Sequence, residues 1–305
     1  MNNHKKTQPL VSSIIIFLNG EQFIEEAIAS IFAQSYDNWE LLLVDDGSTD
    51  SSTLIAQKHA QKYPKKVFYL EHEGHQNKGM SASRNLGISQ AKGKYIGFLD
   101  VDDIWLPKKL EEQVALLTSY KEAAMVYGRT QIWYSWTGKP EDHQRDYFYN
   151  LGVQPNSLVN PPKLLLLLIL NKCQTPTTCN ALIRREVFEQ IGKFEDVFHT
   201  MYEDQVFFSK VLLQKPVFVA GQCWARYRQH FQSCSEQTEN QKYYLTRRPF
   251  LNWLGNYLSK QQVKDQEIWQ VFQREMWQCK HPLLFSLLDR VKYRLNSIRK
   301  RYLML

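Results

Sequence analysis

The sequence predicts an α/β fold in which helices flank a mostly parallel sheet, and two observations carry this prediction. Apolar runs at residues 11–18, 39–44 and 95–99 have the length of buried strands. Segments with apolar residues at helical spacing, at 21–34 and 78–90, lie between these runs. Strands that alternate with helices form βαβ units, and the strands of such units lie parallel.

The same alternation predicts the remaining elements. Further helices are expected at 52–63, from Leu106-Pro107 to about 119, at 185–192 and at 203–213. Further strands are expected at 66–70, 124–132, 180–184 and 217–228. Residues 138–162 predict a long irregular loop, residues 164–170 a buried turn of helix, and the chain beyond about 236 a helical extension.

Composition indicates a globular protein without a membrane span. Of 305 residues, 43% are hydrophobic and 23% are charged, which is ordinary for such proteins. The five cysteines are scattered and form no CxxC pair, so we expect reduced thiols rather than a zinc or disulfide framework. The polar N-terminus lacks a signal-peptide core, and the apolar run at 164–170 is too short to cross a bilayer. A cytoplasmic location is therefore expected.

The net charge of +7 is concentrated near the C-terminus. From Arg290 onward the chain carries six Lys or Arg residues and no acidic residue, while aliphatic residues recur at helical spacing between 283 and 298. Such a helix either lies on an anionic membrane surface as a peripheral contact or packs on the protein with a solvated basic face, and the sequence leaves both open. Without a basic patch interleaved with aromatic residues or a known module, we expect no nucleic-acid partner.

Polar clusters follow three of the four strands expected in the first half of the chain. They are Asn19, then Asp45-Asp46, then Asp100-Val101-Asp102-Asp103. An unpaired carboxylate is costly to bury inside a strand, so these side chains are expected at the strand ends. Because ligands of open α/β sheets bind beyond the carboxyl ends of the strands, the three clusters predict one shared site.

The triplet Asp100-Val101-Asp102 suggests a site for a divalent cation. In an extended chain residues i and i+2 point to the same side, so both carboxylates face one point. Mn²⁺ or Mg²⁺ would accept such oxygen ligands and would neutralise a diphosphate group. The alternative is a solvated turn, with Asp103 as the cap of the following helix.

Read together and in order, the segments resemble the family 2 glycosyltransferases. In the first half the similar segments are 13–20, 42–50, 77–79, 82–85 and 98–103. In the second half they are 180–185, 191–194, 202–204 and 227–230. The similarity covers roughly residues 10–235, and the ordered set is far more specific than any single motif.

The resemblance implies a GT-A fold, with a Rossmann-like nucleotide-binding half at 10–105 and an acceptor half at 106–235. Residues 236–305 would form a helical basic extension. The implied activity is inverting, metal-dependent transfer of a sugar from a nucleotide-diphosphate sugar, UDP above all, to an acceptor hydroxyl or amine. The acceptor would be a sugar or a lipid-linked molecule, and the process cell-envelope or polysaccharide synthesis.

The resemblance also assigns roles to residues of the first half. Asp46 would bind the base, and Asp45 would shape the loop. Asp100 would contact the ribose, and Asp102 would ligate Mn²⁺ or Mg²⁺. Asn19 is also assigned to the donor.

Two assignments from the second half, His230 and Asp204, and one from the helix at 78–90 keep a structural alternative. Arg228 and His230 would lie near the diphosphate and the metal, with His230 as a ligand, unless His230 is an ordinary hydrogen-bonded histidine. Asp204 would be the general base, because displacement at the anomeric carbon needs a carboxylate within reach of the acceptor; the alternative is a helix cap. Arg84 would bind the donor or pair with a neighbouring carboxylate.

One departure from the family pattern concerns the base. The family often has Pro-x-Tyr-Asn at the end of the first strand, whereas this chain has Ile16-Phe17-Leu18-Asn19. Leu18 offers no aromatic ring for stacking, which leaves a catalytically silent nucleotide-binding or scaffold protein as the alternative. A nucleotidyltransferase or a nicotinamide dehydrogenase would need a glycine-rich loop after the first strand, and Asn19-Gly20-Glu21-Gln22 is not such a loop.

Overall fold

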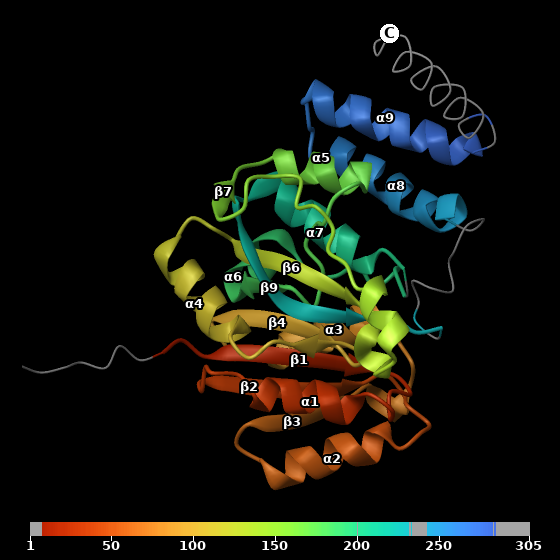
Figure 1. Cartoon of the computed structure of the whole chain (residues 1–305). Helices are drawn as coiled ribbons and strands as arrows, with labels where there is room; N and C mark the ends of the chain where they lie inside the picture. The colour runs from red at the N-terminus through yellow and green to blue at the C-terminus, as the bar shows by residue number, and fades with distance from the viewer. Residues whose placement is uncertain (1–7, 200, 232, 234–242, 283, 285–305) are drawn as a thin grey trace, which may run out of the picture. The chain divides into compact units, whose positions relative to one another are not determined.

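The computed structural model describes residues 8–199, 201–231, 233, 243–282 and 284 (Figure 1). Contacts divide the chain into two compact units, residues 1–236 and residues 237–305. The sheet belongs to the first unit, and the second unit contributes helices.

In the described part of the chain, nine strands form one sheet in the order β3-β2-β1-β4-β8-β6-β9-β5, with β7 paired to β9. The first four strands are β1 (Val11–Phe17), β2 (Trp39–Asp45), β3 (Val67–Glu71) and β4 (Tyr95–Asp100). All pairs among these four are parallel, as predicted. β1 and β2 are buried along their whole length, which explains why they read as continuous apolar runs.

Helices cover both faces of this parallel half. They are α1 (Ile24–Phe32), α2 (Ser52–Lys62), α3 (Met80–Gln90) and α4 (Lys109–Ser119). The core on one face joins α1, α2 and α4 to alternate residues of β1, such as Ile15. α3 packs on the other face, where Gly87 allows close approach: a Cβ atom there would lie 2.7 Å from Cγ2 of Ile14.

The second half adds antiparallel pairs to the sheet. Its elements are β5 (Ile104–Trp105), β6 (Met125–Trp133), β7 (Ser157–Val159), α5 (Lys163–Leu170), β8 (Ala181–Arg184), α6 (Arg185–Ile191), α7 (Glu203–Gln214) and β9 (Val217–Arg228). β8 runs antiparallel to both β4 and β6, and so joins the two halves into one sheet. The buried helix expected at 164–170 is confirmed as α5.

The structure corrects the prediction that residues 138–162 are irregular throughout. This stretch contains a 3₁₀ helix at Pro140–Arg145 and the short strand β7, which pairs antiparallel with β9. Three residues are too few to show the alternation of apolar and polar side chains that identifies a strand. The extended conformation of β7 therefore depends on its pairing with β9 rather than on its own sequence.

The second unit contains α8 (Tyr243–Lys260) and α9 (Gln266–Lys280). The Asp265 carboxylate caps α9 by accepting hydrogen bonds from the backbone amides of Glu267 and Ile268. A buried ion pair between Arg247 and Glu275, 3.0 Å long, joins the two helices. None of the helices in the described ranges is long and apolar enough to cross a membrane. The basic amphipathic segment predicted at 283–298 lies, apart from Leu284, outside the described residues.

Candidate active site

A cavity of about 460 Å³ lies at the carboxyl ends of β1 and β4. Five of the nine residues assigned to the site from the sequence line it: Asn19, Asp46, Asp100, Asp102 and His230. The three polar clusters therefore meet at one site, as the parallel topology requires. Four further candidates are not among the lining residues, namely Asp45, Arg84, Asp204 and Arg228.

The ends of β1 and β2 are tied together by short polar side chains. Asn19 has a φ of +52°, a left-handed conformation that asparagine tolerates well, and its Oδ1 accepts the Thr49 amide at 2.7 Å. The Ser48 hydroxyl accepts the Asn19 amide at 3.0 Å. Asp45 accepts the Ser48 amide at 2.8 Å, so it shapes this loop from beneath rather than lining the cavity.

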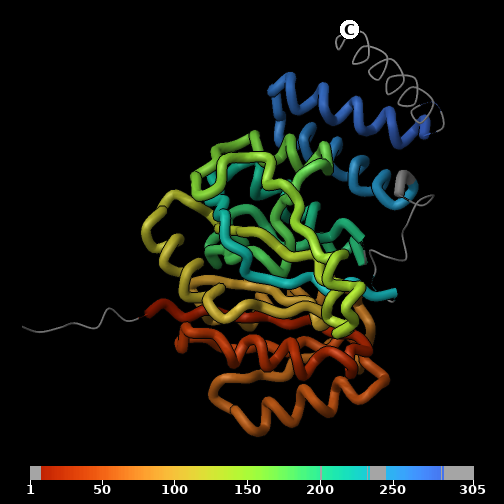
Figure 2. Tube along the Cα trace, in the orientation of Figure 1, coloured from red at the N-terminus to blue at the C-terminus, as the bar shows by residue number. Residues whose placement is uncertain are grey.

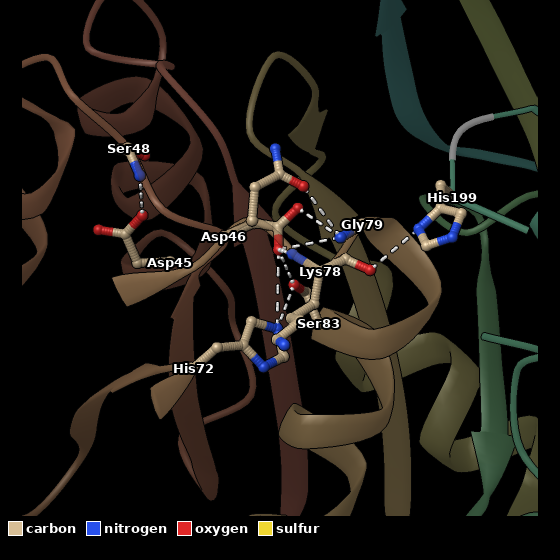
Figure 3. Close-up of polar contacts among 9 residues, drawn as sticks. Asp45, Asp46, Ser48, His72, Lys78, Gly79, Ser83 and His199 are labelled. Carbon is tan, nitrogen blue, oxygen red and sulfur yellow. Dashed lines mark hydrogen bonds and ion pairs between the residues drawn. The ribbon is translucent and has the colours of Figure 1, made fainter. Parts of the chain in front are cut away.

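Asp46 organises a second loop over the cavity (Figure 3). Its carboxylate accepts the amides of Lys78 and Gly79 and the hydroxyl of Ser83, at 2.8, 3.0 and 3.0 Å. The imidazole of His72 lies 3.6 Å from the same carboxylate. Oδ1 accepts from Lys78, Gly79 and Ser83, whereas Oδ2 accepts only from Gly79. Because a carboxylate oxygen can accept two hydrogen bonds, Asp46 holds the loop and Oδ2 keeps a lone pair for a ligand in the cavity.

Arg84 lies behind the cavity wall. Its guanidinium, 1% exposed, donates to the Asp100 carboxylate at 2.7 Å and to the Glu203 carboxylate at 2.6 Å. Thr178 donates to the second oxygen of Asp100 at 2.8 Å. Arg84 thus pairs with neighbouring carboxylates, which was the structural alternative for this residue, and it reaches the cavity wall only through Asp100.

We predict that Arg84→Met destabilises the fold. The substitution leaves the Asp100 and Glu203 carboxylates close together without their shared cation, at a cost of about 3–5 kcal/mol. Urea unfolding would measure this as a lower midpoint. Arg185→Met is the matched control, because Arg185 is exposed and makes one long bond, 3.3 Å, to the Lys92 carbonyl; equal losses in both variants would contradict the prediction.

Asp102 faces the cavity beside His230. The His230 Nε2 lies 3.0 Å from Asp102 Oδ2, and the imidazole packs on the Phe23 ring. Arg228 donates from Nε to the Asp102 carbonyl at 2.6 Å and from Nη2 to the Glu26 carboxylate. Arg228 is buried, so it fixes the main chain of Asp102 from behind instead of lining the cavity.

Asp103 does not cap a helix. Its Oδ1 accepts the Arg228 amide at 2.9 Å, and the residue that precedes α4 is Lys108. Burial, together with the neighbouring Asp102 carboxylate, raises the pKa of Asp103 well above its ordinary value.

Two side chains of the cavity could hold a metal ion. Asp102 supplies a carboxylate and His230 an imidazole, and both line the cavity. In the described ranges no cluster of three or more His, Cys, Asp or Glu side chains could hold an ion. The pair therefore fits a cation such as Mn²⁺ or Mg²⁺ that takes its remaining ligands from substrate phosphates and water.

Asp204 is the second residue of α7, and it does not cap that helix. The residue before α7 is Tyr202, with a φ of +65°, whereas Asp204 Oδ1 accepts the adjacent Gln205 amide at 2.7 Å. Burial, then the charge of Glu203, raises the pKa of Asp204 to about 7. Its neighbour Glu203 is linked through Arg84 to Asp100 in the cavity wall, so Asp204 lies beside the site.

Several side chains that build the site were missed in the sequence. The sequence indicates Glu203 only as part of a motif, and it indicates no role in the site for Glu26, Phe23 and His72. One feature of the sequence does indicate a role for Glu203. It is an acidic residue next to the candidate base Asp204, and a buried carboxylate needs a cation as its partner. The partners of Arg84 and Arg228 are 119 and 202 residues away along the chain, beyond any local pattern.

Comparison with known proteins identifies relatives of this chain. The model of the glycosyl transferase family 2 matches residues 12–192. An uncharacterized glycosyltransferase of Rickettsia felis is 30% identical over 76% of this chain and 36% of its own length. The putative glycosyltransferase EpsE of Bacillus subtilis is 41% identical over 39% of this chain and 42% of its own length. The chain thus spans about two fifths or less of these relatives.

Solved structures share the fold. TarS of S. aureus in complex with UDP gives a TM-score of 0.63 at 18% identity, covering 91% of this chain and 74% of that one. The mannosyltransferase PcManGT from Pyrobaculum calidifontis, in complex with GDP-Man and Mn²⁺, gives a TM-score of 0.56 at 16% identity. The match covers 89% of this chain and 70% of that one. The predicted GT-A architecture, a mostly parallel sheet flanked by helices, is confirmed.

Proposed function

The chain belongs to glycosyl transferase family 2, and we propose that it transfers a sugar from a nucleotide-diphosphate sugar, most favourably a UDP-sugar, to an acceptor hydroxyl or amine. The observation that carries the proposal is the cavity at the strand ends, where Asp46, Asp100, Asp102 and His230 meet. A relative in Bacillus subtilis is named as a putative teichuronic acid biosynthesis glycosyltransferase, which supports a role in cell-envelope polysaccharide synthesis.

In this proposal the donor lies along the edge of the parallel strands. Asp46 accepts a hydrogen bond from the base while Leu18 and Asn19 contact it from the end of β1. Asp100, held by Arg84 and Thr178, accepts from the ribose hydroxyls. Asp102 and His230 would hold Mn²⁺ or Mg²⁺, and the ion, when bound, would supply positive charge to the leaving diphosphate.

Asp204 is the proposed general base. Its carboxylate takes the proton of the acceptor hydroxyl as the acceptor oxygen bonds to the anomeric carbon and the bond from that carbon to the diphosphate breaks. One displacement inverts the configuration at that carbon. A pKa near 7 lets the carboxylate both accept this proton and release it to water at neutral pH.

Turnover of donors by the native chain tests the proposal. Incubation with Mn²⁺ and either UDP-GlcNAc or GDP-mannose is expected to release one nucleoside diphosphate slowly, with water as the acceptor. The sugar released should first appear by NMR with the anomeric configuration opposite to that of the donor. Retained configuration would exclude the single displacement, and nucleotide binding without any release would favour the scaffold alternative.

We predict that Leu18→Tyr strengthens nucleotide binding. Leu18 lines the cavity and is partly exposed, so a tyrosine ring has room to stack on the base. Stacking of a base on an aromatic ring contributes about 1–3 kcal/mol, which corresponds to a fivefold or larger fall in the Kd for UDP. Leu18→Met is the control of similar size without a ring. Unchanged affinity in Leu18→Tyr would show that the base does not contact this position.

A further inference from the structure

An exposed group of aromatic side chains lies beside the cavity. Tyr147 and Tyr149 are 41% and 48% exposed, and their rings meet edge to face with centroids 5.1 Å apart. Their hydroxyl oxygens are 3.0 Å apart. Contiguous exposed aromatic surface of this kind marks ligand-binding surfaces more often than scattered single residues do.

The register of the sheet places Tyr147 on the face that carries the cavity wall. Tyr147 and Ile132 of β6 exchange two backbone hydrogen bonds, 3.0 and 3.3 Å long, and Ile132 is aligned with Tyr227 of β9. Residues opposite each other on neighbouring strands point to the same face. Tyr227 lines the cavity, so Tyr147 stands on the same face, two strand spacings or about 10 Å away.

A second contact supports this position. Trp136, which precedes the aromatic group on the same segment, packs edge to face on Phe23 of the cavity wall, with ring centroids 5.8 Å apart. Figure 2 traces, in lime, the segment of the chain that carries the aromatic group. The aromatic group therefore continues the cavity outward.

The segment that carries the rings is held in place at both ends. The Asp146 carboxylate accepts the amides of Tyr134 and Ser135, at 2.7 and 3.0 Å. At the other end the Asn150 carbonyl accepts the Gln174 amide at 2.7 Å. The rings are thus presented in a fixed arrangement, which lowers the entropy cost of binding.

The chemistry of the surface favours a sugar ring over a lipid chain. In the described residues between 131 and 160, the large apolar side chains that are exposed are all aromatic: Tyr147, Phe148 and Tyr149. A pyranose ring combines an apolar face with a rim of hydroxyls, which matches tyrosine, a ring with a polar end. We propose that Tyr147 and Tyr149 form a subsite for a pyranose unit of an oligosaccharide acceptor. The subsite proposal rests on the proposed function, because a glycosyltransferase requires an acceptor.

Saturation-transfer NMR on the full chain tests the subsite. The probes are maltohexaose, cellohexaose and chitohexaose, because stacking on a ring face requires no single linkage. At least one probe should bind, and Tyr147→Ala combined with Tyr149→Ala should weaken it about tenfold. The double Phe variant keeps the rings and should retain most of the affinity. Phe148→Ala is the matched control: successive side chains of an extended segment alternate in direction, so its ring faces the other way.

Three results would overturn the proposal. The first is the absence of saturation transfer from every probe, and the second is equal weakening by Phe148→Ala and by the double Ala variant. The third is binding of phosphatidylglycerol vesicles by the native chain that is lost in the double Ala variant alone, which would indicate a membrane surface instead. UDP binding in the same samples separates the two proposals: if UDP binds with Mn²⁺ and no probe binds, the subsite alone fails.

Discussion

Asp102→Ala is expected to lower the rate of sugar transfer by about 10³-fold or more, because it removes the only carboxylate among the two proposed metal ligands. The fold should survive. The Asp102 side chain is 23% exposed, and the bond from Arg228 is made to its main-chain carbonyl, which the substitution keeps. Release of nucleoside diphosphate from the donor and a thermal melt of the same sample measure the two effects.

The control for this result is Glu122→Ala, which removes an exposed carboxylate in the loop after α4. It should leave both activity and melting temperature unchanged. An active Asp102→Ala enzyme would contradict the proposed metal site. A variant that melts many degrees lower would show instead that Asp102 acts mainly in folding.

Asp204→Asn is expected to lower kcat by about 10²–10⁴-fold with little change in donor affinity, because an amide cannot accept the acceptor proton. In the native enzyme the rate should rise as the pH increases through about 7, the pKa of Asp204 in the folded chain. Steady-state rates between pH 5 and 9 test this. A flat profile, or a variant of native activity, would assign the base to another residue.

The raised pKa of Asp204 also has a consequence for stability. The folded chain holds the Asp204 proton more tightly than the unfolded chain, where the ordinary value is 3.8. Between that value and about 7 the native chain therefore loses stability as the pH rises. Asp204→Asn carries no such charge, so above pH 7 it should melt at a higher temperature than the native chain. A lower melting temperature for Asp204→Asn would mean that the carboxylate stabilises the fold.

The strands and helices of the parallel half were predictable because their signal is local. β1 and β2 are buried throughout and so read as apolar runs, and the helix α3 was predicted within two residues. The short strand β7 was not predictable, since its three residues carry no period and depend on the partner strand β9. The start of α1 was misplaced by three residues because residues 20–23 form a turn held by the Gly20 carbonyl.

The site residues that directly follow the ends of strands were predictable from the sequence. Asn19, Asp46, Asp100 and Asp102 meet because parallel strands end at one edge. The pairing of Arg84 with a carboxylate was foreseen as an alternative, but its partner Glu203, 119 residues away, could not be identified. The role of Arg228 could not be foreseen, since its partner Glu26 lies 202 residues away along the chain. Nor does the sequence show which side of the sheet the tyrosines at 147 and 149 occupy; that follows from the pairing of Tyr147 with β6.

In the proposed function, the cavity binds a nucleoside diphosphate through a metal held by Asp102 and His230. Calorimetric titration of UDP into the native chain, with and without Mn²⁺, tests it most directly. The proposal predicts binding that requires the ion and that is lost in both Asp102→Ala and His230→Ala. Tight UDP binding of equal strength without Mn²⁺, or unchanged binding in both variants, would contradict it.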